Sequence, residues 1–174
     1  MENQNLVDYL IRHGYLKTHK IIQAFRSIDR KLFVLQSEEA YEDFPLPIHG
    51  GQTISAPHMV AIMLELLEPK KTDVALEIGS GSGYNTALLG LLTKKVFSIE
   101  IDEELVSFAK ENLKKTKIKN TSIILGDGSK GLPGKLFNKI IFTCAVREIP
   151  QTVIDQLKDS GTLIAPVGGH TQDL

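Results

Sequence analysis

The chain has 174 residues, of which 42% are hydrophobic and 24% are charged. This composition is typical of one globular domain with a substantial core, and it excludes an intrinsically disordered chain. A formal net charge of -1 supplies no overall attraction to nucleic acid, so no nucleic-acid partner is expected.

Two amphipathic helices are predicted at the start of the chain. Apolar residues recur at helical spacing in 6–11 and again in 21–28, where Thr18 precedes the second helix as a plausible cap. Prolines and paired glycines then interrupt residues 30–53 and exclude long regular elements there. An irregular stretch of this size in a globular domain is usually functional. A further helix with a broad apolar face is predicted over 59–67.

Beyond this helix the pattern alternates between strand and helix. We predict strands at 73–78, 95–100, 121–125, 139–143 and 162–167, and helices near 84–92, 102–115 and 150–158. Asp102 is expected to cap its helix, and Gly161 to end the last one. Such alternation predicts an α/β fold: a mostly parallel sheet with right-handed crossovers and helices on both faces.

A glycine-rich turn joins the first of these strands to its helix. Residues 77–84 read Glu-Ile-Gly-Ser-Gly-Ser-Gly-Tyr, which lacks the third glycine of a dinucleotide fingerprint and the Gly-Lys-Ser/Thr of a phosphate loop. Glu77 would repel a pyrophosphate but would attract a cation such as the ammonium of a methionine moiety. The turn therefore favours S-adenosyl-L-methionine, which carries an ammonium and a sulfonium but no phosphate.

The next strand also ends on an acid, Glu100, which is suited to accept hydrogen bonds from both hydroxyls of a ribose. The carboxyl ends of parallel strands share one edge of the sheet. A crevice at that edge would therefore collect residues 77–83, Glu100, residues 126–128 and Thr143.

With these residues in place, nearly the whole chain resembles the protein-L-isoaspartate (D-aspartate) O-methyltransferase family of class I S-adenosylmethionine-dependent methyltransferases. The matching motifs are Arg30–Val34, Ala40–Asp43, Pro45–Ile48, Gln52–Met59, Leu76–Tyr84, Gly126–Gly128 and Pro166–Gly168. The Thr-Ile-Ser-Ala-Pro-His-Met run within Gln52–Met59 is close to diagnostic of the family, whereas most methyltransferases share the glycine loop. The fold implied is a three-layer Rossmann-like one.

The resemblance implies a role for each matched position. Ser55 is the implied catalytic serine. The implied cofactor-binding residues are Ala56, Pro57, His58 and Met59 along the cofactor, Glu77, Gly79, Ser80, Gly81 and Gly83 at its methionine end, Glu100 and Ile101 at the ribose, and Asp127 and Gly128 at the adenine. The implied substrate is a protein or peptide L-isoaspartyl residue, methylated on its free α-carboxylate. The resulting ester collapses without the enzyme to a succinimide.

The implied chemistry agrees with the absence of a catalytic His-Asp pattern. A carboxylate with a pKa of about 4 is already ionised at neutral pH and needs no general base. Structural alternatives stand beside these roles: Ser55 as a helix cap, His58 as a helix-start residue, Asp127 as a turn former, and Tyr41 with Asp43 as a loop anchor. No histidine has metal-ligand spacing, so no metal is expected.

Cys144 is the only cysteine, so no internal disulfide forms, which is typical of a reducing cytosol. Its place after an apolar run predicts a small buried hydrophobe. No stretch is long enough to span a bilayer, and residues 1–5 have no signal-peptide character. We expect a cytoplasmic monomer with no membrane partner.

Three features depart from the family pattern. Asn138 stands where an aspartate is usual, residues 158–161 replace the usual Pro-Gly-Gly, and the chain ends at Leu174 where the family continues through two more strands. We expect a single methyltransferase domain over 1–174, with a substrate-side region at 1–55 and a cofactor-binding core at 56–174. The alternatives are a related enzyme acting on normal aspartate in a peptide precursor, and a catalytically weak cofactor-binding protein with an uncovered sheet edge.

Overall fold

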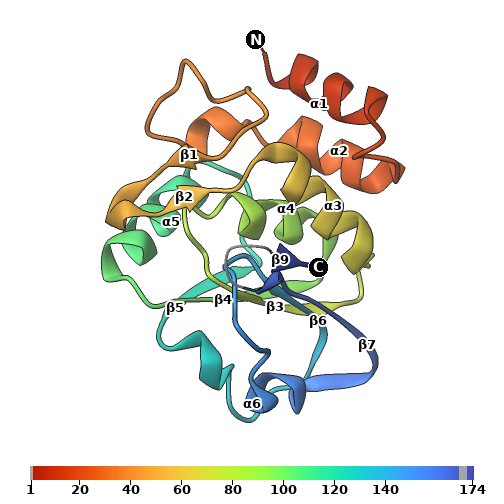
Figure 1. Cartoon of the computed structure of the whole chain (residues 1–174), viewed down its shortest axis with the longest axis vertical. Coiled ribbons are helices and arrows are strands. Elements are labelled where there is room, and N and C mark those ends of the chain that lie inside the picture. The colour runs from red at the N-terminus through yellow and green to blue at the C-terminus, as the bar shows by residue number, and fades with distance from the viewer. Residues whose placement is uncertain (1, 169–171) are drawn as a thin grey trace.

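Five apolar runs form one parallel sheet in the computed structural model, which describes residues 2–168 and 172–174 (Figure 1). Its strand order is β5-β4-β3-β6-β7. The sheet strands are β3 (Val74–Ile78), β4 (Lys95–Glu100), β5 (Thr121–Leu125), β6 (Phe137–Phe142) and β7 (Leu157–Ile164). The helices are α1 (Asn3–Arg12), α2 (His19–Ser27), α3 (Pro57–Leu67), α4 (Tyr84–Leu92), α5 (Glu103–Lys114) and α6 (Gln151–Ile154). The predicted α/β fold is confirmed.

Short elements fill the region that the sequence predicts to be irregular. They are the 3₁₀ turns η1 (Arg30–Phe33) and η2 (His49–Gly51) and the two-residue strands β1 (Leu46–Pro47) and β2 (Thr53–Ile54), which pair antiparallel. The turn η3 (Gly128–Lys130) follows β5, and the strands β8 (Val167–Gly168) and β9 (Gln172–Asp173) pair antiparallel after β7.

The order of the strands determines where a ligand can bind. The chain runs from β3 outward through β4 to β5, then returns to the other side of β3 to form β6 and β7. This reversal opens a crevice beyond the carboxyl ends of β3 and its neighbours, the usual position of ligands in open α/β sheets.

Alternate residues of each strand face opposite sides of the sheet. Leu76 and Ile78 of β3 belong to the apolar cluster that contains Val153 of α6, whereas Ile141 of β6 belongs to the cluster formed with α1 to α5. Figure 1 accordingly shows α1 to α5 on one side of the sheet and α6 on the other. Glu77, between Leu76 and Ile78, faces the side on which α4 packs.

Glu65 of α3 anchors the N-terminal helices. Its Oε1 accepts hydrogen bonds from the backbone amides of Lys17 and Thr18, both at 2.8 Å, and its Oε2 accepts one from the Thr18 hydroxyl at 2.6 Å. Thr18 stands at the predicted cap position of α2, but its hydroxyl is used by this contact and makes no cap bond within the described chain. Asp102, in contrast, caps α5 as predicted, accepting from the amides of Glu104 and Leu105 at 2.8 and 3.2 Å.

The last predicted helix is wrong in length. α6 ends at Ile154, and the chain joins the sheet at Leu157, which pairs with Phe137 of β6. The Gln156 side chain holds this early turn by accepting from the Leu132 amide at 2.7 Å. Gly161, predicted to end a helix, therefore lies inside β7, because pairing with β6 outweighs the local helical pattern.

Within residues 2–168 and 172–174 no helix is both long and apolar enough to cross a membrane. The same residues contain no group of three or more His, Cys, Asp or Glu side chains placed to hold a metal ion.

Candidate active site

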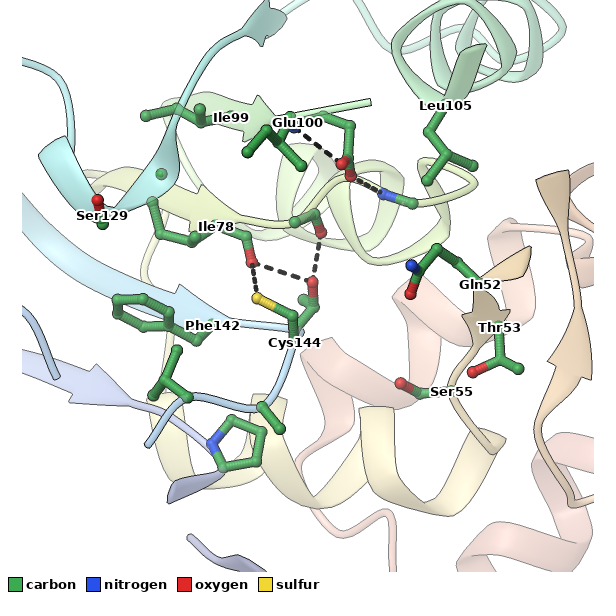
Figure 2. A pocket seen from close by; sticks show the side chains of 18 of the residues that line it. Gln52, Thr53, Ser55, Ile78, Ile99, Glu100, Leu105, Ser129, Phe142 and Cys144 are labelled. Carbon is green, nitrogen blue, oxygen red and sulfur yellow. Dashed lines mark hydrogen bonds between the residues drawn. The ribbon is translucent and has the colours of Figure 1, made fainter. Parts of the chain in front are cut away.

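A pocket of about 630 Å³ lies at the carboxyl ends of β3, β4 and β6 (Figure 2). Figure 2 shows Thr53 and Ser55 on one side, with Ile78 and Phe142 facing them across the pocket and Glu100 at its far end. The volume is in the range of about 300 to 1,000 Å³ that small-molecule sites usually have. The pocket therefore occupies the crevice that the strand order predicts.

The predicted site residues divide into two sets. Those that line the pocket are Ser55, Met59, Gly79, Gly81, Glu100, Ile101, Asp127 and Gly128. Those that the structure places outside its lining are Ala56, Pro57, His58, Glu77, Ser80 and Gly83. For both sets a direct contact with the cofactor stays a prediction, and the residues of the second set have other structural tasks.

The start of α3 turns away from the pocket. Ala56 and Pro57 are buried at the first turn of this helix. The His58 ring is engaged elsewhere: its Nδ1 lies 3.0 Å from Asp43 Oδ1, and its ring centroid is 5.3 Å from that of Tyr15. Of the predicted segment beyond Ser55, only Met59 reaches the pocket.

Glycine is required at two positions of the loop for two different reasons. Gly79 has φ +93°, and a Cβ there would lie 2.8 Å from Oγ1 of Thr143, whose hydroxyl donates to the Gly79 carbonyl. Gly83 has φ +86°, and a Cβ there would lie 3.2 Å from the carbonyl oxygen of Ala109 in α5. Gly79 therefore lets Thr143 pack closely against the loop, whereas Gly83 lets α4 pack closely against α5.

Glu77 and Ser80 face the protein interior beneath the loop. The Glu77 carboxylate accepts hydrogen bonds from Asn85 Nδ2 at 2.8 Å and from the Thr86 hydroxyl, and it is 0% exposed. The Ser80 hydroxyl lies 2.7 Å from that of Ser98 and lines a second, smaller cavity of about 50 Å³. Both side chains fasten the loop to the strands and helix below it.

The environment of Glu77 differs from the one that the sequence suggests. The expected attraction of an ammonium assumes an ionised carboxylate, but burial raises the pKa of Glu77 from 4.5 to about 7. Hydrogen bonds from Ser98, Thr86 and Asn85 oppose this shift, and the nearby charge of Glu100 adds to it. Near neutral pH the group is thus partly protonated, and its contact with Asn85 and Thr86 is structural.

This raised pKa predicts how stability depends on pH. The folded protein holds the Glu77 proton more tightly than the unfolded chain, so its contribution is fully present below pH 4.5 and is lost as the pH rises to about 7. The shift corresponds to about 3 kcal/mol of unfolding free energy. Urea unfolding at pH 5 and pH 8 should show this loss in the wild type and not in Glu77→Gln, whose amide has no proton to exchange in this range.

The matched control is Glu111→Gln on the exposed surface of α5. It should keep the wild-type dependence on pH, because its side chain has no buried contacts to lose. Equal slopes for the wild type and Glu77→Gln would contradict the prediction.

Glu100 ties the glycine loop to the end of β4. Its Oε2 accepts from the Gly81 amide at 2.9 Å, and its Oε1 accepts from the amides of Ile101 and Asp102 at 2.9 and 3.2 Å. A carboxylate has about four acceptor positions, so one remains on Oε2 for a ligand hydroxyl. Glu100 is 6% exposed and lines the pocket, where this position could serve one ribose hydroxyl and not the two that the sequence suggests; its contact with the ribose stays a prediction.

Ser55 faces the pocket and does not cap α3. The cap position belongs to Ala56, and the described residues show no side-chain bond from it. Asp43 does this work from the preceding loop, accepting from the His58 amide at 2.9 Å. Tyr41 anchors the same loop separately by donating to Asp29 Oδ1 at 2.8 Å. The cap alternative for Ser55 is therefore wrong, and the loop-anchor alternative for Tyr41 and Asp43 is confirmed.

Asp127 and Gly128 follow β5 and line the same pocket. The Asp127 carboxylate accepts from the amide and hydroxyl of Ser129 at 3.0 and 2.7 Å, and these bonds lower its pKa. A Cβ on Gly128 would collide with the Ile78 side chain. Asp127 is thus a turn former that also lines the pocket, and its contact with the adenine stays a prediction.

Sequence reasoning missed the wall supplied by the segment after β6. Cys144 is exposed and lines this wall together with Val146, whereas the sequence predicts a buried cysteine. β6 ends at Phe142, so Cys144 already lies beyond the sheet. The order of the strands could have located Cys144. β6 is next to β3, so a residue directly after β6 lies at the same edge of the sheet as the glycine loop, which follows β3.

Comparisons with known proteins agree with this geometry. The family model for Protein-L-isoaspartate(D-aspartate) O-methyltransferase (PCMT) matches residues 1–174. The chain belongs to this family. A protein-L-isoaspartate O-methyltransferase of Pyrococcus horikoshii is 49% identical over 168 residues, which are 94% of this chain and 76% of that protein. One of Fervidobacterium nodosum is 49% identical over 171 residues, 95% of this chain and 85% of that protein.

A solved structure of the family supplies the cofactor class. A Plasmodium falciparum protein described as a protein-L-isoaspartate O-methyltransferase, in complex with S-adenosyl-L-homocysteine, aligns with a TM-score of 0.88. It is 30% identical, and the alignment covers 99% of this chain and 87% of that one. The PCMT family is S-adenosylmethionine-dependent, and this chain is a methyltransferase of that class.

The residues present fit this cofactor. Gly79, Gly81 and Gly128 line the pocket without side chains, so a ligand can approach the backbone there, and Glu100 keeps a free acceptor position at the pocket wall. Ile78 and Phe142 supply apolar surface on one side. When bound, S-adenosylmethionine supplies a methyl group on a sulfonium; this PCMT chain supplies the space and the hydrogen-bonding groups around it.

Proposed function

We propose that this protein transfers a methyl group from S-adenosyl-L-methionine to the free α-carboxylate of L-isoaspartyl residues in damaged proteins or peptides. The proposal rests on one observation: Ser55, the loop glycines Gly79 and Gly81, and the acid Glu100 line the same pocket. A hydroxyl from the segment typical of the family thus faces the cofactor loop across a single cavity. The product ester then collapses to a succinimide without the enzyme.

Ser55 orients the substrate in this proposal. Its hydroxyl donates a hydrogen bond to the substrate carboxylate, which is ionised at neutral pH because its pKa is about 4. No residue has to remove a proton, so the work of the site is alignment, which recovers roughly 7 to 11 kcal/mol of barrier in well-oriented reactions. Met59, Met63 and Phe142 add apolar lining that limits water around the reacting groups.

The cofactor-side residues have separate proposed tasks. Gly79 and Gly81 admit the methionine end, and Glu100 accepts from a ribose hydroxyl through its remaining acceptor position. Asp127 and Gly128 meet the adenine end, and Ile101 follows Glu100 at the ribose. The support for each is its place in the pocket lining.

A paired-peptide assay tests the proposed function. The protein is incubated with cofactor labelled on its methyl group and with two peptides that differ only in carrying L-isoaspartate or normal aspartate at one position. We expect label on the isoaspartyl peptide alone. Equal labelling of both peptides or labelling of the aspartyl peptide would overturn the specificity. Cofactor binding by calorimetry without transfer to either peptide would overturn the activity.

We also propose that the enzyme works as a cytoplasmic monomer formed by one domain over 1–174. A single cysteine, which cannot form an internal disulfide, suits a reducing compartment. Light scattering coupled to gel filtration should give the mass of one chain, 19.2 kDa; twice that mass would contradict the monomer.

A further inference from the structure

Arg30 is a charged side chain in the middle of the protein. It begins the turn η1, is 0% exposed, and donates from Nη2 to the carbonyl oxygen of Ser55 at 3.0 Å. Its guanidinium carbon lies 5.2 Å from the centroid of the Tyr84 ring. Arg30 thus contacts two segments. Its Nη2 donates to Ser55 in the substrate-side segment, and its guanidinium lies over the ring of Tyr84, the first residue of α4 directly after the glycine loop.

This burial is costly for stability. Nε and Nη1 of Arg30 find no hydrogen-bond partner in the part of the chain that the structure describes. Burial lowers the pKa of Arg30, and the charge of Asp43 is too distant to form an ion pair under 4 Å among the described residues. Buried charges with unpaired donors destabilise a fold, and apolar replacements of similar volume are often neutral or stabilising. Stability alone does not explain an arginine here.

The contacts of Arg30 explain what it does. The Ser55 carbonyl accepts a hydrogen bond from Arg30. Three residues later, the His58 amide donates one to the Asp43 carboxylate at 2.9 Å. The short segment 55–58 is therefore held at both ends. Tyr84, in turn, is fixed by the Phe33 ring at a centroid distance of 5.5 Å, in the same turn as Arg30. The two buried residues of the turn η1, Arg30 and Phe33, thus connect the Ser55 backbone to the helix that follows the glycine loop.

We propose that Arg30 is a positioning residue for methyl transfer: it fixes the Ser55 backbone relative to the cofactor loop without contacting substrate or cofactor. The inference rests on the function proposed above. An error of about 1 Å in the position of a reacting group can cost on the order of 100-fold in rate. Loss of the Arg30 bond to Ser55 should therefore affect turnover more than binding.

The test is Arg30→Met, which keeps most of the volume but removes the charge and the donor. We expect kcat with an isoaspartyl peptide to fall about 30- to 100-fold, because the Ser55 backbone loses its anchor. The Kd for S-adenosyl-L-homocysteine should change less than about threefold, and the Tm should not fall, because two unpaired donors leave the core. Arg26→Met is the matched control; its arginine pairs with Asp8 on the surface at 3.0 Å.

Three results would overturn the inference. One is a kcat for Arg30→Met within about twofold of Arg26→Met, and another is a loss of kcat that only follows a lower Tm. If Arg30→Met does not fold, Arg30→Lys takes its place. It keeps the charge but not the planar fork, and unchanged kcat with unchanged Tm would then be the overturning result. A wild-type protein inactive on isoaspartyl peptide would overturn the proposed function instead, which separates the two failures.

Discussion

Ser55→Ala is expected to lower kcat on an isoaspartyl peptide by about 100-fold, because the substrate carboxylate loses the hydroxyl that orients it. The Tm and the Kd for S-adenosyl-L-homocysteine should stay close to those of the wild type. The structure supports this separation, since Ser55 faces the pocket and makes no cap bond to α3 among the described residues. Steady-state kinetics, thermal unfolding and calorimetry on the same preparation measure the three quantities.

Asp43→Ala is the control for the structural effect. Asp43 holds the His58 amide and imidazole, so its loss should lower stability by about 1 kcal/mol, the usual cost of a lost helix cap. Ser55→Ala should therefore leave the Tm above that of Asp43→Ala. A Tm for Ser55→Ala as low as that of Asp43→Ala, with the loss of rate no larger than the loss of folded protein, would contradict an orienting role.

Glu100→Gln should weaken cofactor binding by about 100-fold, the second large effect. The amide that replaces Oε2 faces the Gly81 amide, donor against donor, and a buried N–H without an acceptor costs about 1 to 3 kcal/mol. We expect the glycine loop to shift away from the new side chain to avoid this cost, which moves Gly81 out of its place in the pocket. The same NH2 group has no lone pair for a ribose hydroxyl, so the acceptor position that Oε2 offered to the ribose is lost as well. Calorimetric titration with S-adenosyl-L-homocysteine measures the change in Kd directly.

The matched control for Glu100→Gln is Glu103→Gln in the exposed first turn of α5. Glu103→Gln also replaces a carboxylate with an amide, three residues later in the chain. It should bind S-adenosyl-L-homocysteine with the Kd of the wild type. A Kd for Glu100→Gln within about threefold of this control would contradict a role of the Glu100 carboxylate in cofactor binding.

Local signals were sufficient for much of the fold and for part of the site. Apolar runs located the five strands, the glycine spacing located the loop, and Asp102 followed the ordinary rule for helix caps. Glu100 was predictable because the last residue of a parallel strand lies at the edge where ligands bind.

Contacts between distant segments account for the rest. Glu77 stands between two apolar residues, so the sequence does not say which face of β3 it occupies, and the packing of α4 decides that. The cap of α3 comes from Asp43, fifteen residues earlier, where no local rule would place it. The helix predicted over 150–158 was shortened because Leu157 pairs with β6.

The hydrogen bonds around the pocket have one further consequence, for the order of folding. They join Asp43 to His58, Gly81 to Glu100, Arg30 to Ser55 and Thr143 to Gly79, across 15, 19, 25 and 64 positions of the chain respectively. These bonds, and above all the one across 64 positions, form only after the segments that they join have been brought together. Enzymatic activity should therefore return late during refolding, after the helical circular dichroism signal, and so report completion of the native topology.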